Sequence, residues 1–365
     1  MTFGDGTVFA LNDASAAVYT EIQVDAYPTI LLTQISESVA NRMANVKQVF
    51  ITEASLRAQV MYDSLARYLE IAMLYGGSGI ATTTSGTHTN GTTTETLVIT
   101  AASWAPGIWA GMVGAKVNFY GASGSPTTIV SSGADAIFTV TSVVAATRTV
   151  VFTGTQTGCT ALDTAATSYA LTIYFNTAYG TEMTGLNAQI VGGATFFGID
   201  PTTYPLWQGQ TYSCSSASLS MSKVLAGAAL AVANGGLNVD AVLMCGAATY
   251  ANLNSDQAAL RQYDGSYSEK ENDSGSEGIV YHGPNGKIKV VVNNIVKDGE
   301  AFLIPPKYLK RVGAKEMSFE RPGQKDVFFQ EIPGYAGYSL RAGAEFAILL
   351  ERPAQSVKFT SIVNS

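Results

Sequence analysis

The two histidines are the first residues to test for catalysis or metal binding, because an imidazole serves in both. His88 and His282 lie in different regions, and neither has a Cys, Asp or Glu at a metal-ligand spacing. There is no Gly-x-Ser-x-Gly elbow, so a nucleophile and base pair has few options. We therefore expect surface or turn histidines, no enzyme activity, and no bound metal or cofactor.

The other candidate sites are better explained by structure than by chemistry. The run Gly76-Gly77-Ser78-Gly79 follows an expected helix, whereas a phosphate-binding loop places its glycines before a helix. Cys159, Cys214 and Cys245 are far apart and odd in number, which predicts buried thiols rather than a disulfide framework. The carboxylates of the polar segment 264–278 have no ordered ligand spacing, so we expect an exposed loop there.

One long helix over residues 52–75 is the strongest element that the sequence predicts. Its apolar stripe recurs at three- to four-residue spacing: Ala58, Met61, Leu65, Leu69 and Ala72. Thr52 can cap the first turn, and Gly76 and Gly77 supply a left-handed exit after Tyr75. The stripe indicates a helix that is docked against another element, and an ordinary core helix is the simplest form of this.

The composition indicates a protein whose surface meets other protein. Of the 365 residues, 47% are apolar and only 13% are charged, about half the usual charged share. Such a surface lacks the charges that keep a monomer soluble, so we expect much of it to face neighbouring subunits. The net charge of −7 repels a phosphate backbone and argues against general nucleic-acid binding. Neither a run of 18 apolar residues nor a signal-peptide pattern occurs, so we expect synthesis and assembly in a cytoplasm.

The first half of the chain is predicted to be mainly extended outside the long helix. Strand candidates at 7–11 and 18–24 can form a hairpin, and a short helix is expected at 36–43. Residues 81–181 contain five charged residues among many Thr, Gly and Ser, and we expect an all-β barrel or sandwich there. A linker-rich extension of the main sheet is the alternative. The strand candidates in this region are 97–100, 115–120, 136–143, 149–153 and 169–175.

The second half predicts a mixed α/β region followed by antiparallel strands. A helix at 218–233 has Leu219, Val224, Leu225 and Leu230 on its apolar side. Further helices are expected at 247–253 and 255–262, and strands at 240–245, 287–293 and 301–304. Strands at 316–319, 327–331, 338–342, 344–350 and 356–362 are expected to pack back on the long helix.

Several strings, in sequence order, resemble the major capsid proteins of tailed phages with the Hong Kong 97 type of fold. They are Tyr68-Leu69-Glu70-Ile71, Trp104-Ala105-Pro106-Gly107-Ile108-Trp109, Phe197-Gly198-Ile199-Asp200, Asn234-Gly235-Gly236-Leu237, Ala258-Ala259-Leu260-Arg261-Gln262-Tyr263-Asp264, Lys310-Arg311-Val312-Gly313 and Ala336-Gly337-Tyr338-Ser339-Leu340-Arg341. No single string is specific, but the ordered set covers nearly the whole chain. The resemblance departs at the N-terminus, where the arm that usually precedes the first hairpin is short or missing.

This resemblance implies an α+β fold in four parts. Residues 1–33 would form the extended-loop hairpin, and residues 34–80 with 305–365 the peripheral domain around a spine helix at 52–75. Residues 81–181 would form an inserted all-β domain, and residues 182–304 the axial domain.

The implied function is self-assembly through pentamers and hexamers into an icosahedral head that encloses double-stranded DNA without sequence-specific binding. The implied location is the virion, after assembly in the bacterial cytoplasm, with portal, cement and scaffold proteins as partners and no membrane. Two sets of residues would lie between subunits. The extended-loop set is Val18, Ile22 and Val24, and the capsomer-centre set is Asp264, Glu269, Lys270, Glu271, Asp273 and Glu277. The alternative function is a Thr-rich β adhesin or a receptor-binding tail fibre.

Overall fold

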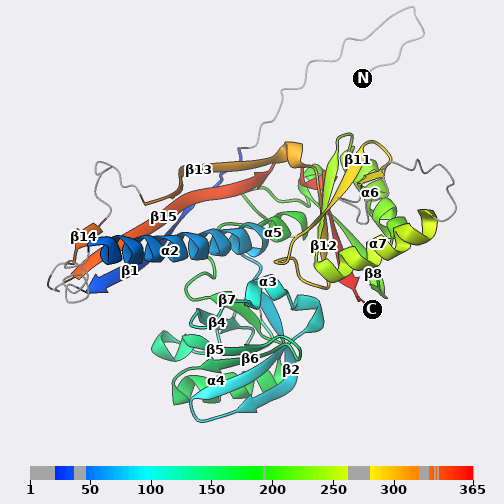
Figure 1. Ribbon diagram of the computed structural model, residues 1–365. Helices are drawn as coiled ribbons and strands as arrows, with labels where there is room; N and C mark the ends of the chain where they lie inside the picture. Colours follow the sequence, from blue (N-terminus) through cyan, green and yellow to red (C-terminus); the bar gives the residue numbers. More distant parts are fainter. Residues whose placement is uncertain are drawn as a thin grey trace, which may run out of the picture.

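The computed structural model describes residues 21–36, 47–125, 127–191, 195–261, 280–319, 329–332, 334 and 337–364. The fold is mixed α/β, with a long helix lying beside a four-stranded sheet, a closed barrel and a six-stranded sheet (Figure 1). None of the described helices is long and apolar enough to span a membrane.

The long helix is α2, Lys47–Tyr75, which has 29 residues and is therefore roughly 44 Å long. It ends at Tyr75 as predicted, but it begins before Thr52, so Thr52 lies inside the helix and does not cap it. Gly77 has a φ of +74°, which gives the expected left-handed exit. Gly76 is required for a different reason, because a Cβ there would lie 2.2 Å from the Met183 carbonyl oxygen.

The predicted stripe of α2 packs on the inner face of an antiparallel sheet. This sheet contains β1 (Tyr27–Ser36), β15 (Gly337–Leu350), β13 (Leu309–Ser318) and β14 (Phe329–Glu331). Met61, Leu65 and Leu69 are buried in one cluster with residues of β15, including Leu340 and Phe346. Residues 338–350, expected to form two strands, belong to the single strand β15.

The strand predicted at 18–24 is not present over residues 21–24, the only part of the two expected hairpin strands that the structure describes. Residues 21–26 have no regular structure, and the strand that follows is β1. β1 pairs along its whole length with β15, so it crosses the expected boundary at residue 33 and belongs to the sheet beside α2. The strand expected at 7–11 and the helix expected after Ser36 lie outside the described residues.

The region after α2 is a closed six-stranded barrel in the order β2-β3-β6-β5-β4-β7. Its strands are β2 (Ala81–Asn90), β3 (Thr94–Ile99), β4 (Lys116–Tyr120), β5 (Phe138–Val144), β6 (Thr149–Thr153) and β7 (Thr172–Phe175). Two helices interrupt the strands, α3 (Pro106–Trp109) and α4 (Gln156–Ser168). The predicted barrel is therefore confirmed, but the expectation that the unit is all-β is wrong, because the apolar side of the helix α4 packs on the barrel.

The six-stranded sheet has the order β10-β11-β9-β12-β16-β8 and mixes parallel with antiparallel pairs. Its strands are β8 (Gln210–Ala217), β9 (Ala241–Cys245), β10 (Val280–His282), β11 (Lys287–Val292), β12 (Ala301–Ile304) and β16 (Val357–Ile362). Its longer helices are α6 (Met221–Gly235) and α7 (Ala247–Arg261), and the short helix α5 (Leu186–Val191) lies between α2 and this sheet (Figure 1).

Three predictions are corrected in this sheet. β16 was expected to pack on the long helix, but it pairs with β12 and β8 because its apolar side chains fill the core of this sheet. The two helices expected after Ala247 are one helix, α7. On α6, Val224 is buried as predicted, but Leu225 and Leu230 are exposed.

Candidate assembly surfaces and a buried histidine–carboxylate cluster

The outer face of β1 presents large apolar side chains to solvent. Along β1, Thr29 and Leu31 are half-buried, whereas Ile30 and Leu32 point the other way and are 68% and 47% exposed. This alternation follows from the two-residue period of a strand whose one side covers α2. We call Ile30 and Leu32 the strand patch.

The helix α2 carries a second exposed apolar patch. Leu56 and Val60 are one turn apart, lie outside the buried stripe, and are 55% and 57% exposed. We call Leu56 and Val60 the helix patch. Single exposed apolar side chains are common on protein surfaces, whereas exposed apolar side chains that lie next to one another are typical of interaction surfaces.

The residues expected between subunits fall partly outside the described residues. Of the extended-loop set, Val18 is not described, Ile22 is exposed, and Val24 packs against the α2 core of its own chain. All of the capsomer-centre set, namely Asp264, Glu269, Lys270, Glu271, Asp273 and Glu277, lies outside the described residues.

A buried polar cluster joins the end of α2 to the six-stranded sheet. The Tyr75 hydroxyl donates to Glu300 at 3.1 Å and accepts from the backbone N–H of Lys297 at 2.9 Å. The other Glu300 carboxylate oxygen accepts from Lys358 at 2.6 Å. Lys297 lies over the Tyr75 ring, 4.1 Å from its centroid, and donates to the Gly79 carbonyl. Burial lowers the pKa of Lys297 to about 8, although the charge of Glu300 opposes this.

The barrel is attached to the rest of the chain at α3. The N–H of Gly107 donates to the Asn294 carbonyl at 2.8 Å, and the Arg67 guanidinium of α2 donates to the Gly107 carbonyl. A Cβ at Gly107 would lie 2.5 Å from the Asn294 carbonyl oxygen. Only glycine allows the backbones to approach this closely.

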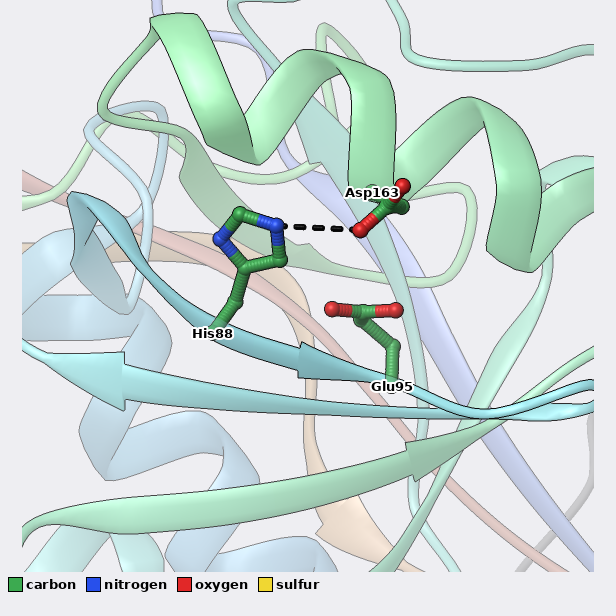
Figure 2. A group of neighbouring side chains, drawn as sticks. All are labelled: His88, Glu95 and Asp163. Carbon is green, nitrogen blue, oxygen red and sulfur yellow. Dashed lines mark hydrogen bonds and ion pairs between the residues drawn. The ribbon is translucent and has the colours of Figure 1, made fainter.

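Within the barrel, the structure brings together three ligand-type side chains that are far apart in sequence. His88 comes from β2, Glu95 from β3 and Asp163 from α4, and Figure 2 shows the three side chains facing one another. Their ligand atoms lie within 4.8 Å of one another, and His88 Nε2 is 3.0 Å from Asp163 Oδ1. The expectation of a surface or turn histidine is therefore wrong for His88, which belongs to a buried cluster.

Glu95 is the most deeply buried member of this cluster. Its exposed fraction is 0%, and neither carboxylate oxygen has a hydrogen-bond partner among the residues that the structure describes. Burial, and then the nearby charge of Asp163, raises the pKa of Glu95 to about 7. The three cysteines are free and buried, as predicted.

Comparison with known proteins finds one family. Residues 170–350, just under half of the chain, match the family described as SU10 major capsid protein. The match takes in the six-stranded sheet up to β12 and the strands β13 to β15, and it leaves the barrel strands β2 to β6 outside. No curated protein matches the sequence.

Several solved structures are similar over parts of the chain. A capsid asymmetric unit of cyanophage A-1(L) is 14% identical with a TM-score of 0.36, over 51% of this chain and 61% of that chain. The capsid of cyanophage P-SCSP1u is 11% identical with a TM-score of 0.30, over 43% and 54%. An encapsulin complex from Synechococcus elongatus is 8% identical with a TM-score of 0.30, over 49% and 56%. The chain thus spans less than two thirds of the length of each.

The long docked helix, the low share of charged residues and the exposed apolar patches agree with this family match. Over residues 170–350 the chain is similar to the SU10 major capsid proteins.

Proposed function

We propose that many copies of this chain assemble through pentamers and hexamers into an icosahedral head shell around double-stranded DNA. The observation that carries this proposal is the family match over residues 170–350. The shell would be built by repeated contacts, each weak alone, whose combined avidity stabilises the particle. The role is structural and not enzymatic, and the chain would reside in the virion after assembly in the host cytoplasm.

The arrangement of elements supports a Hong Kong 97 type of fold. In this proposal, α2 and the sheet of β1, β13 and β15 form the peripheral domain, and the six-stranded sheet forms the axial domain. The barrel is an insertion that projects from the shell, and its strands β2 to β6 lie outside the family match. Portal, scaffold and cement proteins are the further partners that this fold would serve.

The strand patch and the helix patch are the proposed contacts with neighbouring subunits. Lysine at Leu56 or Ile30 would place a charge in a buried interface, which costs several kcal/mol per contact and is repeated in every subunit. We expect either variant to leave a folded subunit that no longer pellets as a shell. Lysine at Ala146, which is exposed in a barrel turn, adds the same charge elsewhere and should still assemble. Shell yields that are equal for all three variants would contradict the role of the patches.

The acidic segment 264–278 is proposed to line the centre of each capsomer. Five or six copies would gather like charges around one opening, so salt or divalent cations should stabilise capsomers. The test replaces Glu269, Glu271 and Asp273 by their amides and follows capsomer dissociation against ionic strength. A salt dependence that these changes leave intact would place the segment away from the axis.

A further inference from the structure

The cluster of His88, Glu95 and Asp163 contains a fully buried carboxylate, Glu95, which has no hydrogen-bond partner among the described residues. Glu95 is fully buried, and among the described residues no Lys or Arg pairs with it or with Asp163. An ionised carboxylate without a hydrogen bond or a counter-charge is costly to bury, so such groups are usually paired or bound to a metal. In the described part of the chain, His88 Nδ1 is also buried without a hydrogen-bond partner. The two carboxylate oxygens of Glu95 and His88 Nδ1 are therefore potential metal-donor atoms that the described protein contacts do not use.

The fold aims these side chains at one another. Asn90 pairs with Glu95 and His88 pairs with Leu97, so His88 lies on the same face of the β2–β3 ladder as Leu97 and Glu95. Between Thr83 and His88 the strand β2 has a register shift. Thr83 pairs with Ile99 and His88 pairs with Leu97, so five residues of β2 advance the pairing by only two residues of β3. Because side chains alternate along a strand, this odd excess turns His88 to the face on which Thr83 also lies. The bulge thus brings the imidazole over Glu95.

The helix α4 supplies the third donor, Asp163, whose side chain is partly exposed to solvent. Asp163 lies near the middle of α4, directly beside the buried Leu162, and its side chain is 33% exposed whereas that of His88 is 12% exposed. Figure 2 shows Asp163 above the imidazole and the Glu95 carboxylate beneath. Asp163 is thus the most exposed of the three side chains, and Glu95 is the most deeply buried.

We propose that His88, Glu95 and Asp163 bind one divalent transition-metal ion, with Zn²⁺ as the representative case. One imidazole nitrogen and two carboxylates are donors that Zn²⁺ accepts, at about 2.0–2.2 Å each. Two donors of one such ion can be no more than roughly 4.4 Å apart, so the present spacing closes with small side-chain rotations. The imidazole favours a transition metal over Mg²⁺ or Ca²⁺, which prefer oxygen ligands only. The bound ion would join α4 to the β2–β3 hairpin.

The test is a Zn²⁺ titration of the full-length protein after removal of metal by a chelator. Isothermal calorimetry should give one high-affinity Zn²⁺ per chain. Glu95→Gln keeps the size of the side chain and should lower the affinity for Zn²⁺ by at least about 100-fold. This is more than the usual loss when a residue that only hydrogen-bonds to a metal ligand is changed. Zn²⁺ should also raise the melting temperature of the wild type but not of Glu95→Gln, because an ion that binds only the folded state stabilises it.

Two controls make the result specific. His282→Gln removes the other histidine and should bind Zn²⁺ like the wild type, whereas Asp163→Asn should bind more weakly. Co²⁺ in the wild type reports the ligands without any variant: a site of nitrogen and oxygen donors gives no thiolate charge-transfer band. The proposal is overturned if the wild type shows no saturable Zn²⁺ binding, if Glu95→Gln binds as tightly as the wild type, if Ca²⁺ competes as well as Zn²⁺, or if Co²⁺ shows thiolate ligation.

Discussion

Two leucines on α2 offer a matched test of how the helix is used, because they differ in burial and not in type. Leu65 is 2% exposed and belongs to the stripe on β15, whereas Leu56 is 55% exposed in the helix patch. We predict that Leu65→Ala lowers the free energy of unfolding of the subunit and leaves its surface unchanged. We predict the reverse for Leu56→Ala, which should fold normally and assemble poorly.

The magnitude for Leu65 follows from its surroundings. Truncating a buried leucine costs about 2–5 kcal/mol, from lost burial and from the cavity that is left. Leu65 also lines a groove of about 380 Å³ with Tyr68 and Phe175, so the new space would join one that already exists. We therefore expect the lower part of the range, about 2–3 kcal/mol. Leu56→Ala should change the free energy of unfolding by no more than about 0.5 kcal/mol.

The assay is urea unfolding of the unassembled subunit, combined with amide hydrogen exchange to locate the change. In Leu65→Ala, exchange should increase in α2 and β15 and stay near wild type in the barrel strands β3 and β6. Shell yield for Leu56→Ala is then measured by sedimentation. Equal stability of the two variants, or faster exchange confined to the barrel, would refute the assignment of the buried and exposed faces of α2.

Three further predictions concern the buried junctions. Tyr75→Phe leaves a buried acceptor and a backbone donor unpaired and should cost about 1–3 kcal/mol by urea unfolding, whereas Tyr169→Phe at an exposed ring should be neutral. The pKa of Lys297 is about 8 in the folded state and 10.5 ordinarily, so the unfolded state binds more protons between these two pH values. The free energy of unfolding of the wild type should therefore rise with pH across this window relative to that of Lys297→Met. If the lysine titrates normally, the two curves of unfolding free energy against pH will be parallel. Gly107→Ala should destabilise by about 1–3 kcal/mol on thermal unfolding, and Gly246→Ala, where a Cβ meets only ordinary contacts, should not.

The parts of the fold that local patterns specify were predictable from the sequence. The stripe of α2 and its stop at Tyr75 follow from helical spacing and two glycines, and the strands β6 and β12 match their predicted ranges. These elements have strong periodicity or β-branched runs, which their burial in the fold then reinforces.

Features set by distant contacts were not predictable. The Thr-rich strand β2 was missed because polar residues give no alternation, although Asn90-Gly91 is a hairpin signal that could have indicated it. The sequence shows no reason for β16 to join the six-stranded sheet, because that choice depends on which core accepts its side chains. The cluster of His88, Glu95 and Asp163 depends on a register shift in β2 and on the docking of α4. Neither feature can be recognised from the spacing of these residues along the sequence.

The central claim is that this chain builds a closed shell, and electron microscopy of the purified, assembled protein tests it most directly. We predict icosahedral particles, together with rings of five and six subunits when assembly is incomplete. Elongated trimers, or monomers under all ionic conditions, would contradict the claim and favour the alternative of a fibre or adhesin.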